Sequence, residues 1–350
     1  MTSICCGQKW DDPNVPHYCT LTESITETSS SDNSSKNTSK NTVIVPNLSA
    51  ARSEKRGTSE NIQVFVRIRP FVGRESDFSA TQEIDSIVHP VGSDALEVKS
   101  SGAARTLHCT YDAVFDVRTT QEEVYDKVRD CTTAVLNGFN STLFAYGQTG
   151  SGKSYTMFGD EDDLSKFKAP KKGKIMSSSA GIIPRAIHEI FSSLSKNTCI
   201  YVSFMQIYNE NIYDLLRDTA MDRPLSIHED TTSGLYVQDL SEYAVRNATD
   251  CLALLQCGEE NRAVRCTHMN QVSSRSHSVF QLFLEKKDET AKRTTRSKLN
   301  LVDLAGSEKW NLDVDLKNAH ISEMNKINLS LHTLGRCISA LATKVLFFKF

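Results

Sequence analysis

Residues 141–154 read Ser-Thr-Leu-Phe-Ala-Tyr-Gly-Gln-Thr-Gly-Ser-Gly-Lys-Ser. The apolar run over 141–146 predicts a strand, and the glycines after it predict a loop that leads into a helix. Three glycines let successive backbone N–H groups curl around a phosphate without interference from Cβ atoms, and the next helix presents its positive end to the same anion. The pattern Gly-x4-Gly-Lys-Ser over 147–154 therefore predicts a site for a nucleotide polyphosphate.

Two residues at the end of this loop carry the expected chemistry. Lys153 would reach the β- and γ-phosphates, and Ser154 would hold Mg²⁺. The alternative is a glycine-rich turn that binds nothing, because this short pattern also arises by chance. The apolar strand directly before the loop favours the nucleotide site.

Composition limits the class of protein. The 350 residues are 39% hydrophobic and 24% charged, which is typical of a soluble globular protein with one large α/β domain or two smaller ones. The net charge of -3 gives no overall attraction to nucleic acid or to an anionic membrane, so neither partner is expected. No stretch approaches the roughly 18 apolar residues that cross a membrane. Ten cysteines without a Cys-x-x-Cys pair predict reduced thiols in the cytosol.

The chain divides into three parts by composition. Residues 1–59 are rich in Ser, Thr and Asn and predict a disordered leader. Residues 60–342 predict a folded domain, with an exposed polar insertion over 159–181, and residues 343–350 form a divergent tail. Strands are expected at 62–70, 199–208, 278–286 and 298–304, a β-rich meander at 225–242, and helices at 120–136, 181–194, 211–216, 248–265 and 321–342.

The alternation of these strands and helices indicates the fold class. An apolar strand followed by a phosphate loop and a helix is typical of an α/β fold. We expect a three-layer sandwich of the P-loop NTPase type, with a central, mostly parallel sheet flanked by helices.

Two further loops have the composition of γ-phosphate sensors. The hydroxyl-rich stretch Asn270–His277 precedes a strand, and Asp303–Glu308 follows another strand. Asp303 at a strand end can order the waters of Mg²⁺, and the Gly306 N–H can donate to a γ-phosphate because no side chain intervenes. The alternatives are a polar turn with serine caps and a strand end with a helix cap.

Gly147–Ser154, Asn270–His277 and Asp303–Glu308, in this order, resemble the phosphate loop, switch I and switch II of the kinesin motor domain. The resemblance covers about residues 61–342. Shorter matches support it: Arg67–Pro70, Phe144–Gly147, Gly181–Arg185, Tyr208–Glu210, Asp214–Leu216, Asn261–Arg262 and Asn328–Leu341.

The resemblance implies ATP and Mg²⁺ as ligands and assigns residues to each. The metal would be held near Ser154, Ser274 and Asp303. The nucleotide would be contacted by Arg67, Arg69, Pro70, Gly147, Gln148, Thr149, Gly150, Ser151, Gly152, Lys153, Ser154 and Tyr155.

The resemblance also implies a hydrolytic mechanism that depends on position and charge rather than on covalent chemistry. Ser273 and Ser274 would close over the γ-phosphate, and Gly306 would sense it. Arg275 and Glu308 would form an ion pair that closes the site and organises the attacking water. The alternative for that pair is a surface salt bridge of little consequence.

Microtubules are the partner that the resemblance implies, in the cytoplasm and on the cytoskeleton. The expected contact face comprises the loop after switch II, the helix 325–336 and the region 225–237. Lys326 and Arg336 of the helix would meet acidic tubulin. Its apolar positions are spaced to face a core: Ile327, Leu331, Leu334, Ile338 and Leu341. No heptad run is present, so oligomerisation is not encoded here.

Two stretches depart from the family pattern. Residues 309–315 lack the expected glycine-containing run, and residues 343–350 do not resemble the elements that follow the long helix in the family. We therefore expect a motor domain truncated at its C-terminal end. A strand near the middle of the sheet would be missing, which would expose unpaired backbone and apolar surface.

Three functions are compatible with the sequence. The first is a microtubule motor domain that binds and hydrolyses MgATP, with force transduction impaired by truncation. The second is a noncatalytic isoform that binds nucleotide or microtubules without turnover. The third is an unrelated P-loop ATPase or GTPase, which the Arg67–Pro70 run and the Asn270–His277 loop argue against.

Overall fold

The structure is a computed structural model that describes residues 2–8, 62–71, 88–99, 106–162, 167–168, 176–195, 197–217, 223–230, 234–268, 273–288, 293–307 and 318–342. Contacts within the chain define two compact units. The first comprises residues 1–21, 61–69 and 115–350, and the second comprises residues 22–60 and 70–114.

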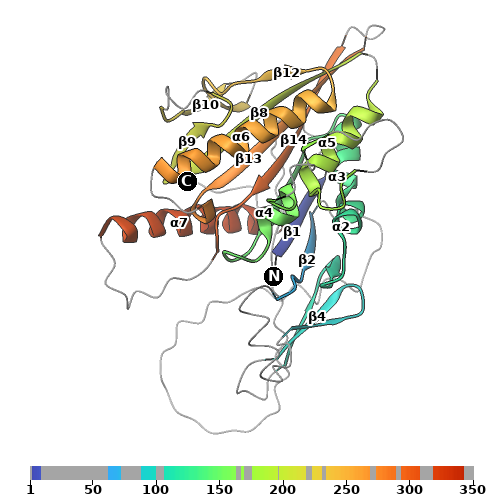
Figure 1. Ribbon diagram of the computed structural model, residues 1–350, viewed down its shortest axis with the longest axis vertical. Coiled ribbons are helices and arrows are strands. Elements are labelled where there is room, and N and C mark those ends of the chain that lie inside the picture. The colour runs from blue at the N-terminus through green and yellow to red at the C-terminus, as the bar shows by residue number, and fades with distance from the viewer. Residues whose placement is uncertain are drawn as a thin grey trace. The chain divides into compact units, whose positions relative to one another are not determined.

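The first unit is built on one large sheet, whose strands lie side by side in the order β12, β8, β13, β14, β7, β1 and β2, with β9 paired to β8 (Figure 1). A short strand, β6 (Ala113–Phe115), lies where the two units divide. The strand bounds are β1 Thr2–Gln8, β2 Ile62–Arg67, β7 Ser141–Tyr146, β8 Thr198–Tyr208, β9 Asn211–Asp214, β12 Tyr243–Val245, β13 His277–Asp288 and β14 Arg293–Asp303.

The expected α/β sandwich is confirmed, but its sheet is mixed rather than mostly parallel. β14 and β7 run parallel. The pairs β8–β13 and β13–β14 are antiparallel, and β1 is antiparallel to both β2 and β7. The reason is connection length: four residues join β13 to β14, which suffices for a hairpin but not for the crossover that a parallel pair requires.

A tight turn joins β8 to β9. Asn209 and Glu210 have positive φ values of 51° and 66°, as the two central residues of a type I′ hairpin turn do. The turn sends the chain back along β8, and Asn211–Asp214 pair with its end. The short helix expected at 211–216 was therefore wrong, because pairing to the sheet overrides local helix propensity.

Helices cover the sheet, and α4, α5 and α6 lie on the viewer's side in Figure 1. The helix expected at 120–136 is two helices, interrupted at Arg129. The others agree with the sequence to within a few residues. Their bounds are α2 Gln121–Val128, α3 Asp130–Leu136, α4 Lys153–Phe158, α5 Ile182–Ser193, α6 Ala248–His268 and α7 Asn318–Ala342.

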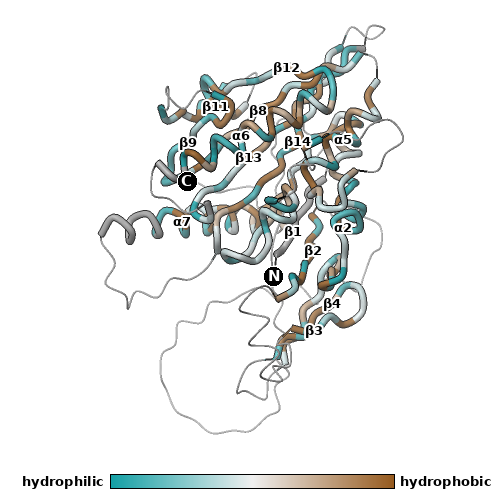
Figure 2. The backbone as a smooth tube through the Cα atoms, in the orientation of Figure 1, coloured by the Kyte–Doolittle hydropathy of each residue, from teal (hydrophilic) through white to brown (hydrophobic). Residues whose placement is uncertain are grey.

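The core lies between the helices and the strands. Phe204 of β8 and Phe280 of β13 are fully buried, and their rings meet edge to face with centroids 5.3 Å apart. Hydrophobic residues along β14 and α5 appear brown in Figure 2. A second cluster joins β7 to α7, where Ile338 packs with Phe144 and Leu304. The predicted apolar stripe of α7 is confirmed at Ile327 and Ile338, which are both buried.

The beginning of the chain differs from the expected disordered leader. Residues Thr2–Gln8 form β1, which lies in the sheet between β2 and β7. Residues 9–61 and the tail 343–350 lie outside the described residues.

Cysteine chemistry differs from the sequence expectation at one position. Cys131 of α3 is disulfide-bonded, so the ten cysteines are not all reduced thiols. Free thiols are present at Cys109, Cys199, Cys251, Cys257 and Cys337. Within the part of the chain that the structure describes, no helix has both the length and the apolar character needed to cross a membrane.

Two small antiparallel sheets complete the structure. In the second unit, β3 (Val88–Val91), β4 (Ala95–Lys99) and β5 (Thr106–Thr110) pair in order around the buried Leu96. In the first unit, β10 (Ile227–Asp230) and β11 (Gly234–Val237) form a hairpin, which confirms the β-rich meander predicted there.

Gly258 allows α6 to pack closely on the sheet, and its replacement tests that contact. A Cβ at this position would lie 2.2 Å from Cδ1 of the buried Phe204 ring. We expect Gly258→Ala to lower the free energy of unfolding by about 1–2 kcal/mol in urea denaturation, because overpacking outweighs the helix propensity of alanine. The matched control is Gly335→Ala on α7, where a Cβ meets nothing within 4 Å. Equal stability of the two variants would contradict the close contact.

Candidate functional site

The site lies where β7 and β14 end side by side. These two strands run parallel, and Asp303 pairs in register with Ala145. Because the carboxyl ends of parallel strands meet at one edge of a sheet, the loop after β7 and the residues after β14 share that edge. Ser307 N donates to Gly147 O at 3.2 Å, which joins the two segments directly.

The predicted phosphate loop has a backbone that glycine permits. Gly150 and Gly152 have φ values of 75° and 95°, in the left-handed region that other residues rarely adopt. Gln148, Thr149 and Gly150 are exposed at the tip, whereas Gly147, Ser151 and Lys153 are buried. The loop therefore has an accessible tip on a buried base.

Lys153 is held along the inside of this loop. Its side chain is 6% exposed, and Nζ donates to the carbonyl oxygens of Gly147 at 2.9 Å and Gln148 at 3.0 Å. The first backbone hydrogen bond of α4 follows, from Thr156 N to Gly152 O. The ammonium group therefore lies at the loop and does not extend into solvent.

A buried carboxylate joins three elements. Asp303 Oδ2 accepts from Ser154 Oγ of α4 at 2.7 Å and from Arg262 Nη1 of α6 at 3.2 Å. Arg262 also donates to Ser278 Oγ at 3.2 Å. The Asp303 residue is 1% exposed, and its Oδ1 is buried with no hydrogen-bond partner among the described residues. An unsatisfied buried carboxylate oxygen is costly, and such an atom calls for an explanation.

The two predicted switch loops meet through their backbones. Gly306 N donates to Ser274 O at 2.7 Å, next to the short 3₁₀ helix Ser273–Arg275. Ser274 and Arg275 are half-buried. Glu308, like Asn270–Val272, lies outside the described residues. The structure thus brings Ser274 and Gly306 together, and it leaves the Arg275–Glu308 pair untested.

Arg67 is buried, and its guanidinium is hydrogen-bonded to other side chains of the protein. Its Nη1 donates to Gln121 Oε1 at 2.9 Å and to Thr156 Oγ1 at 3.0 Å, and its guanidinium lies 5.2 Å from the Tyr155 ring centroid. Burial lowers the pKa of Arg67, although arginine stays charged in proteins. The side chain thus ties β2 to α2 and α4. Arg69 is half-buried, and Pro70 is exposed.

His277 connects the site to α7. Its Nδ1 accepts from Ala305 N at 3.0 Å, which places the proton of the neutral ring on Nε2. That nitrogen donates to Ser330 Oγ at 2.8 Å, and Ser330 Oγ donates in turn to Ile327 O. Burial, together with the nearby positive charges of Arg262 and Lys153, lowers the pKa of His277 to about 4.

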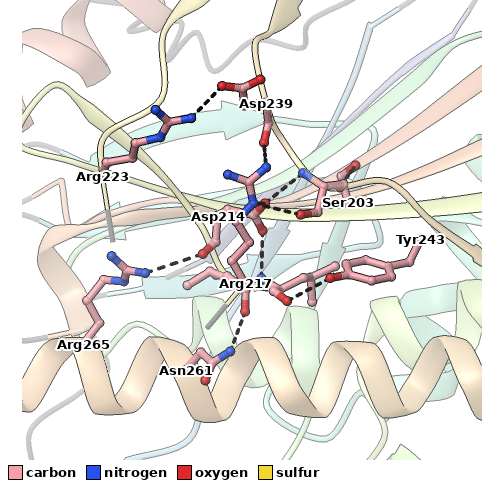
Figure 3. Close-up of polar contacts among 11 residues, drawn as sticks. Ser203, Asp214, Arg217, Arg223, Asp239, Tyr243, Asn261 and Arg265 are labelled. Atoms are coloured by element: carbon pink, nitrogen blue, oxygen red, sulfur yellow. Dashed lines mark hydrogen bonds and ion pairs between the residues drawn. The ribbon is translucent and has the colours of Figure 1, made fainter. Parts of the chain in front are cut away.

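The helix that carries Arg262 is anchored to the β8–β9 hairpin (Figure 3). Asn261 Nδ2 donates to Leu215 O at 2.8 Å, and Arg265 Nη2 donates to Asp214 O at 3.5 Å. The Asp214 carboxylate accepts the backbone N–H groups of Leu216 and Ser241. Because these contacts flank Arg262 on both sides, they fix the part of α6 from which its side chain reaches Asp303.

Sequence reasoning missed Arg262 and His277 as parts of the site. Asn261–Arg262 and Asp214–Leu216 were recognised as matches to a family, but no role was assigned to them. The available signal was the family match at Asn261–Arg262. Its partner Asp303 lies 41 residues further along the chain, so the pairing could not be found from the sequence.

Two exposed surfaces away from this centre carry large apolar residues, and the first of them also carries a basic residue. On α7, Leu329 is 55% exposed and Arg336 is exposed, opposite the buried Ile327 and Ile338. On the β10–β11 hairpin, Ile227 and Leu235 are 62% and 61% exposed. Large exposed apolar side chains that gather on one element are typical of contact surfaces.

Comparisons with known proteins agree with this arrangement. Residues 67–348 match the kinesin motor domain family. Kinesin-related protein 5 of Dictyostelium discoideum is 40% identical over 81% of this chain and 27% of its own length, and Kinesin-like protein KIN-5C of Oryza sativa subsp. japonica is 37% identical over 83% and 30%. A solved structure of a fast kinesin, whose title refers to its ATPase mechanism and its interactions with microtubules, superposes with a TM-score of 0.68 at 36% identity. That superposition covers 80% of this chain and 75% of the other.

This chain therefore belongs to the kinesin motor domain family. It spans less than a third of the length of the relatives named above. The resemblance drawn from the three loops is confirmed.

His277 makes stability depend on pH. The folded state disfavours the protonated ring. As pH falls below about 6.5, the ordinary pKa of histidine, the unfolded chain therefore binds a proton that the folded chain does not. Stability is unaffected above that pH, and it falls by about 3 kcal/mol as pH approaches 4. We expect His277→Asn, which keeps an acceptor for Ala305 N, to remove this part of the pH dependence in urea unfolding. His332→Asn, at an exposed position of α7, is the control. An unchanged pH slope in His277→Asn would disprove the assignment.

Proposed function

We propose that this chain binds MgATP, hydrolyses it and binds microtubules. The observation that carries the proposal is the meeting of three segments at one sheet edge. Ser154 and Lys153 follow the phosphate loop, Asp303 accepts from Ser154, and Gly306 lies against Ser274. Membership of the kinesin motor domain family supports the same function.

The nucleotide is held by the loop 147–154 and by residues around it. Lys153 is proposed to exchange its loop carbonyl partners for the β- and γ-phosphate oxygens, and the loop N–H groups surround the β-phosphate. Tyr155, 44% exposed, offers its ring to the adenine side. Its neighbour Arg67 acts there through packing, because its guanidinium is already hydrogen-bonded to Gln121 and Thr156. Arg69 and Pro70 complete the proposed adenine side.

The residues present fit a magnesium ion. Asp303 has a buried Oδ1 with no hydrogen-bond partner in the described part of the chain, and its other oxygen meets the Ser154 hydroxyl. Mg²⁺ prefers oxygen ligands and is commonly held by one or two protein groups together with phosphates and waters. We assign Ser154, Ser274 and Asp303 to this ion. When bound, it neutralises charge that develops on the phosphates.

Hydrolysis is the attack of water on the γ-phosphate, which releases ADP and inorganic phosphate. Ser273 and Ser274 close over the γ-phosphate, and the Gly306 N–H turns from Ser274 O toward it. Arg275 and Glu308 pair across the two loops and orient the water. These roles supply position and charge stabilisation, which are the main needs of phosphoryl transfer.

Microtubules are met by the exposed side of α7 and by the β10–β11 hairpin. Lys326 and Arg336 supply positive charge to an acidic partner, and Leu329, Ile227 and Leu235 supply apolar area. His277 joins this surface to the nucleotide loops through Ser330 and Ala305. A microtubule-associated location in the cytoskeleton follows from the function.

The test of the whole proposal is ATP turnover by the purified chain with and without polymerised microtubules, together with a thermal melt. We expect turnover that microtubules stimulate. A chain that melts cooperatively and binds ATP but does not turn it over would favour a noncatalytic binding protein instead.

Lys153→Ala tests the phosphate site. Loss of charge-assisted hydrogen bonds to phosphate is expected to weaken binding of a nonhydrolysable ATP analogue by about 10- to 100-fold or more, as measured by fluorescence titration. The control is Lys298→Ala, a substitution on β14 well before the end of the strand. Unchanged affinity in Lys153→Ala would refute the site.

Glu308→Ala tests the proposed latch separately from binding. The affinity for the ATP analogue is expected to stay within about twofold, while turnover falls by at least about 100-fold, since only the attacking water loses its orientation. Parallel loss of binding and turnover, with a lowered melting temperature, would point to a folding defect and not to a latch.

A further inference from the structure

The strand β1 is paired on both sides throughout its central part. Residues 2–7 are in register with residues 67–62 of β2, and residues 3–8 are in register with residues 146–141 of β7. β1 is antiparallel to each neighbour, so β2 and β7 run in the same direction on either side of it. The first residues of the chain therefore occupy a central position in the largest sheet.

The two flanking strands depend on an occupant of this position. Neighbouring strands lie about 4.8 Å apart, so β2 and β7 are too far from one another to pair directly across the space that β1 fills. Leu143, Phe144 and Ala145 of β7 and Phe65 and Val66 of β2 are all buried. Without a strand between them, backbone N–H and C=O groups along both would lack partners beside the core.

The connection between β1 and β2 is long. Residues 9–61, 53 in number, separate Gln8 from Ile62, whereas hairpins that fix a strand by its turn use about 2–5 residues. A long connection gives a low effective concentration of the strand at its position. Main-chain pairing with β2 and β7 is the contact that the structure gives on both sides of this strand.

The sequence of the segment suits a central strand. Thr2–Gln8 reads Thr-Ser-Ile-Cys-Cys-Gly-Gln and contains neither a charged residue nor a proline. A charged side chain on a strand in the middle of the sheet would need a partner for its charge. A proline would remove a backbone hydrogen bond to β2 or to β7. The chemistry that this position accepts is thus an uncharged extended peptide of about seven residues.

We propose that the space between β2 and β7 is a strand-accepting site, and that Thr2–Gln8 is a separable peptide that fills it within the same chain. Recognition is by the main chain on both sides, as in proteins that bind a peptide by adding it to a sheet. The occupant thereby holds β7, whose last residue Tyr146 pairs with Ser3 immediately before the phosphate loop. The proposal stands independently of any catalytic activity.

The test uses the full chain with Ile4→Pro, since Ile4 pairs with both Phe65 and Ala145 and a proline cannot complete a central ladder. The probe is a fluorescent peptide of residues 1–10, used in reductant. We expect saturable binding to the Ile4→Pro chain at least about tenfold tighter than to the wild-type chain, and no binding of a peptide that carries the same proline. Thr38→Pro, within the connecting segment, is the matched control and should behave as wild type.

Hydrogen exchange supplies a readout at the site itself. Amides of residues 62–67 and 141–146 are expected to exchange at least about tenfold faster in Ile4→Pro than in wild type, and to regain protection when the free peptide is added. Wild-type protection in Ile4→Pro, without peptide binding, would overturn the proposal. A dimer that forms with concentration and that the peptide dissolves would also overturn it, because the occupant would then come from a second copy.

If Ile4→Pro does not fold, the proposal is tested instead by placing a protease site in residues 9–61 of the wild-type chain. After folding and cleavage, the N-terminal fragment should stay bound and exchange with the fluorescent peptide. Immediate release of the fragment without loss of protection in β7 would refute the proposal.

Discussion

The carboxylate of Asp303 is buried at the end of β14, where its charge can persist only with partners. Ser154 and Arg262 supply hydrogen bonds to one of its oxygens from α4 and α6. A buried ion pair is costly to assemble and still more costly to break, because removing one partner leaves the other charge unpaired. The positions of α4, α6 and the end of β14 therefore depend on one another. The positions of the loops next to these elements depend on the same contacts.

Further contacts hold β14 and α6 in position. Parallel pairing of β14 with β7 brings Asp303 to the loop 147–154. Asn261 and Arg265 hold α6 to the main-chain carbonyls of residues 214 and 215. His277 extends the arrangement to α7 through Ala305 and Ser330. Hydrogen bonds through the buried His277 and the half-buried Ser330 thus link the segment after β14 to α7.

A second constraint is that the strands inside the sheet need a hydrogen-bonded neighbour on both sides. β7 leads into the loop 147–154, and without β1 this strand would be paired only with β14, with the backbone groups of its other side lacking partners. Sequence reasoning expected a missing strand near this place, and the structure fills the position with Thr2–Gln8. The disordered-leader interpretation failed there because seven uncharged residues carry too little local signal to reveal which strands they join.

The sequence by itself determined the strands, helices and loops whose patterns are local. The glycine spacing over 147–154, the apolar stripe of α7 and the order of the three loops predicted the phosphate loop, the long helix and the family. Tertiary structure alone decided that Arg262 meets Asp303, that His277 joins Ala305 to Ser330, and that the sheet is mixed. The physical reason is separation along the chain: backbone periodicity is set within a few residues, whereas burial and pairing unite groups that only the packed fold brings together.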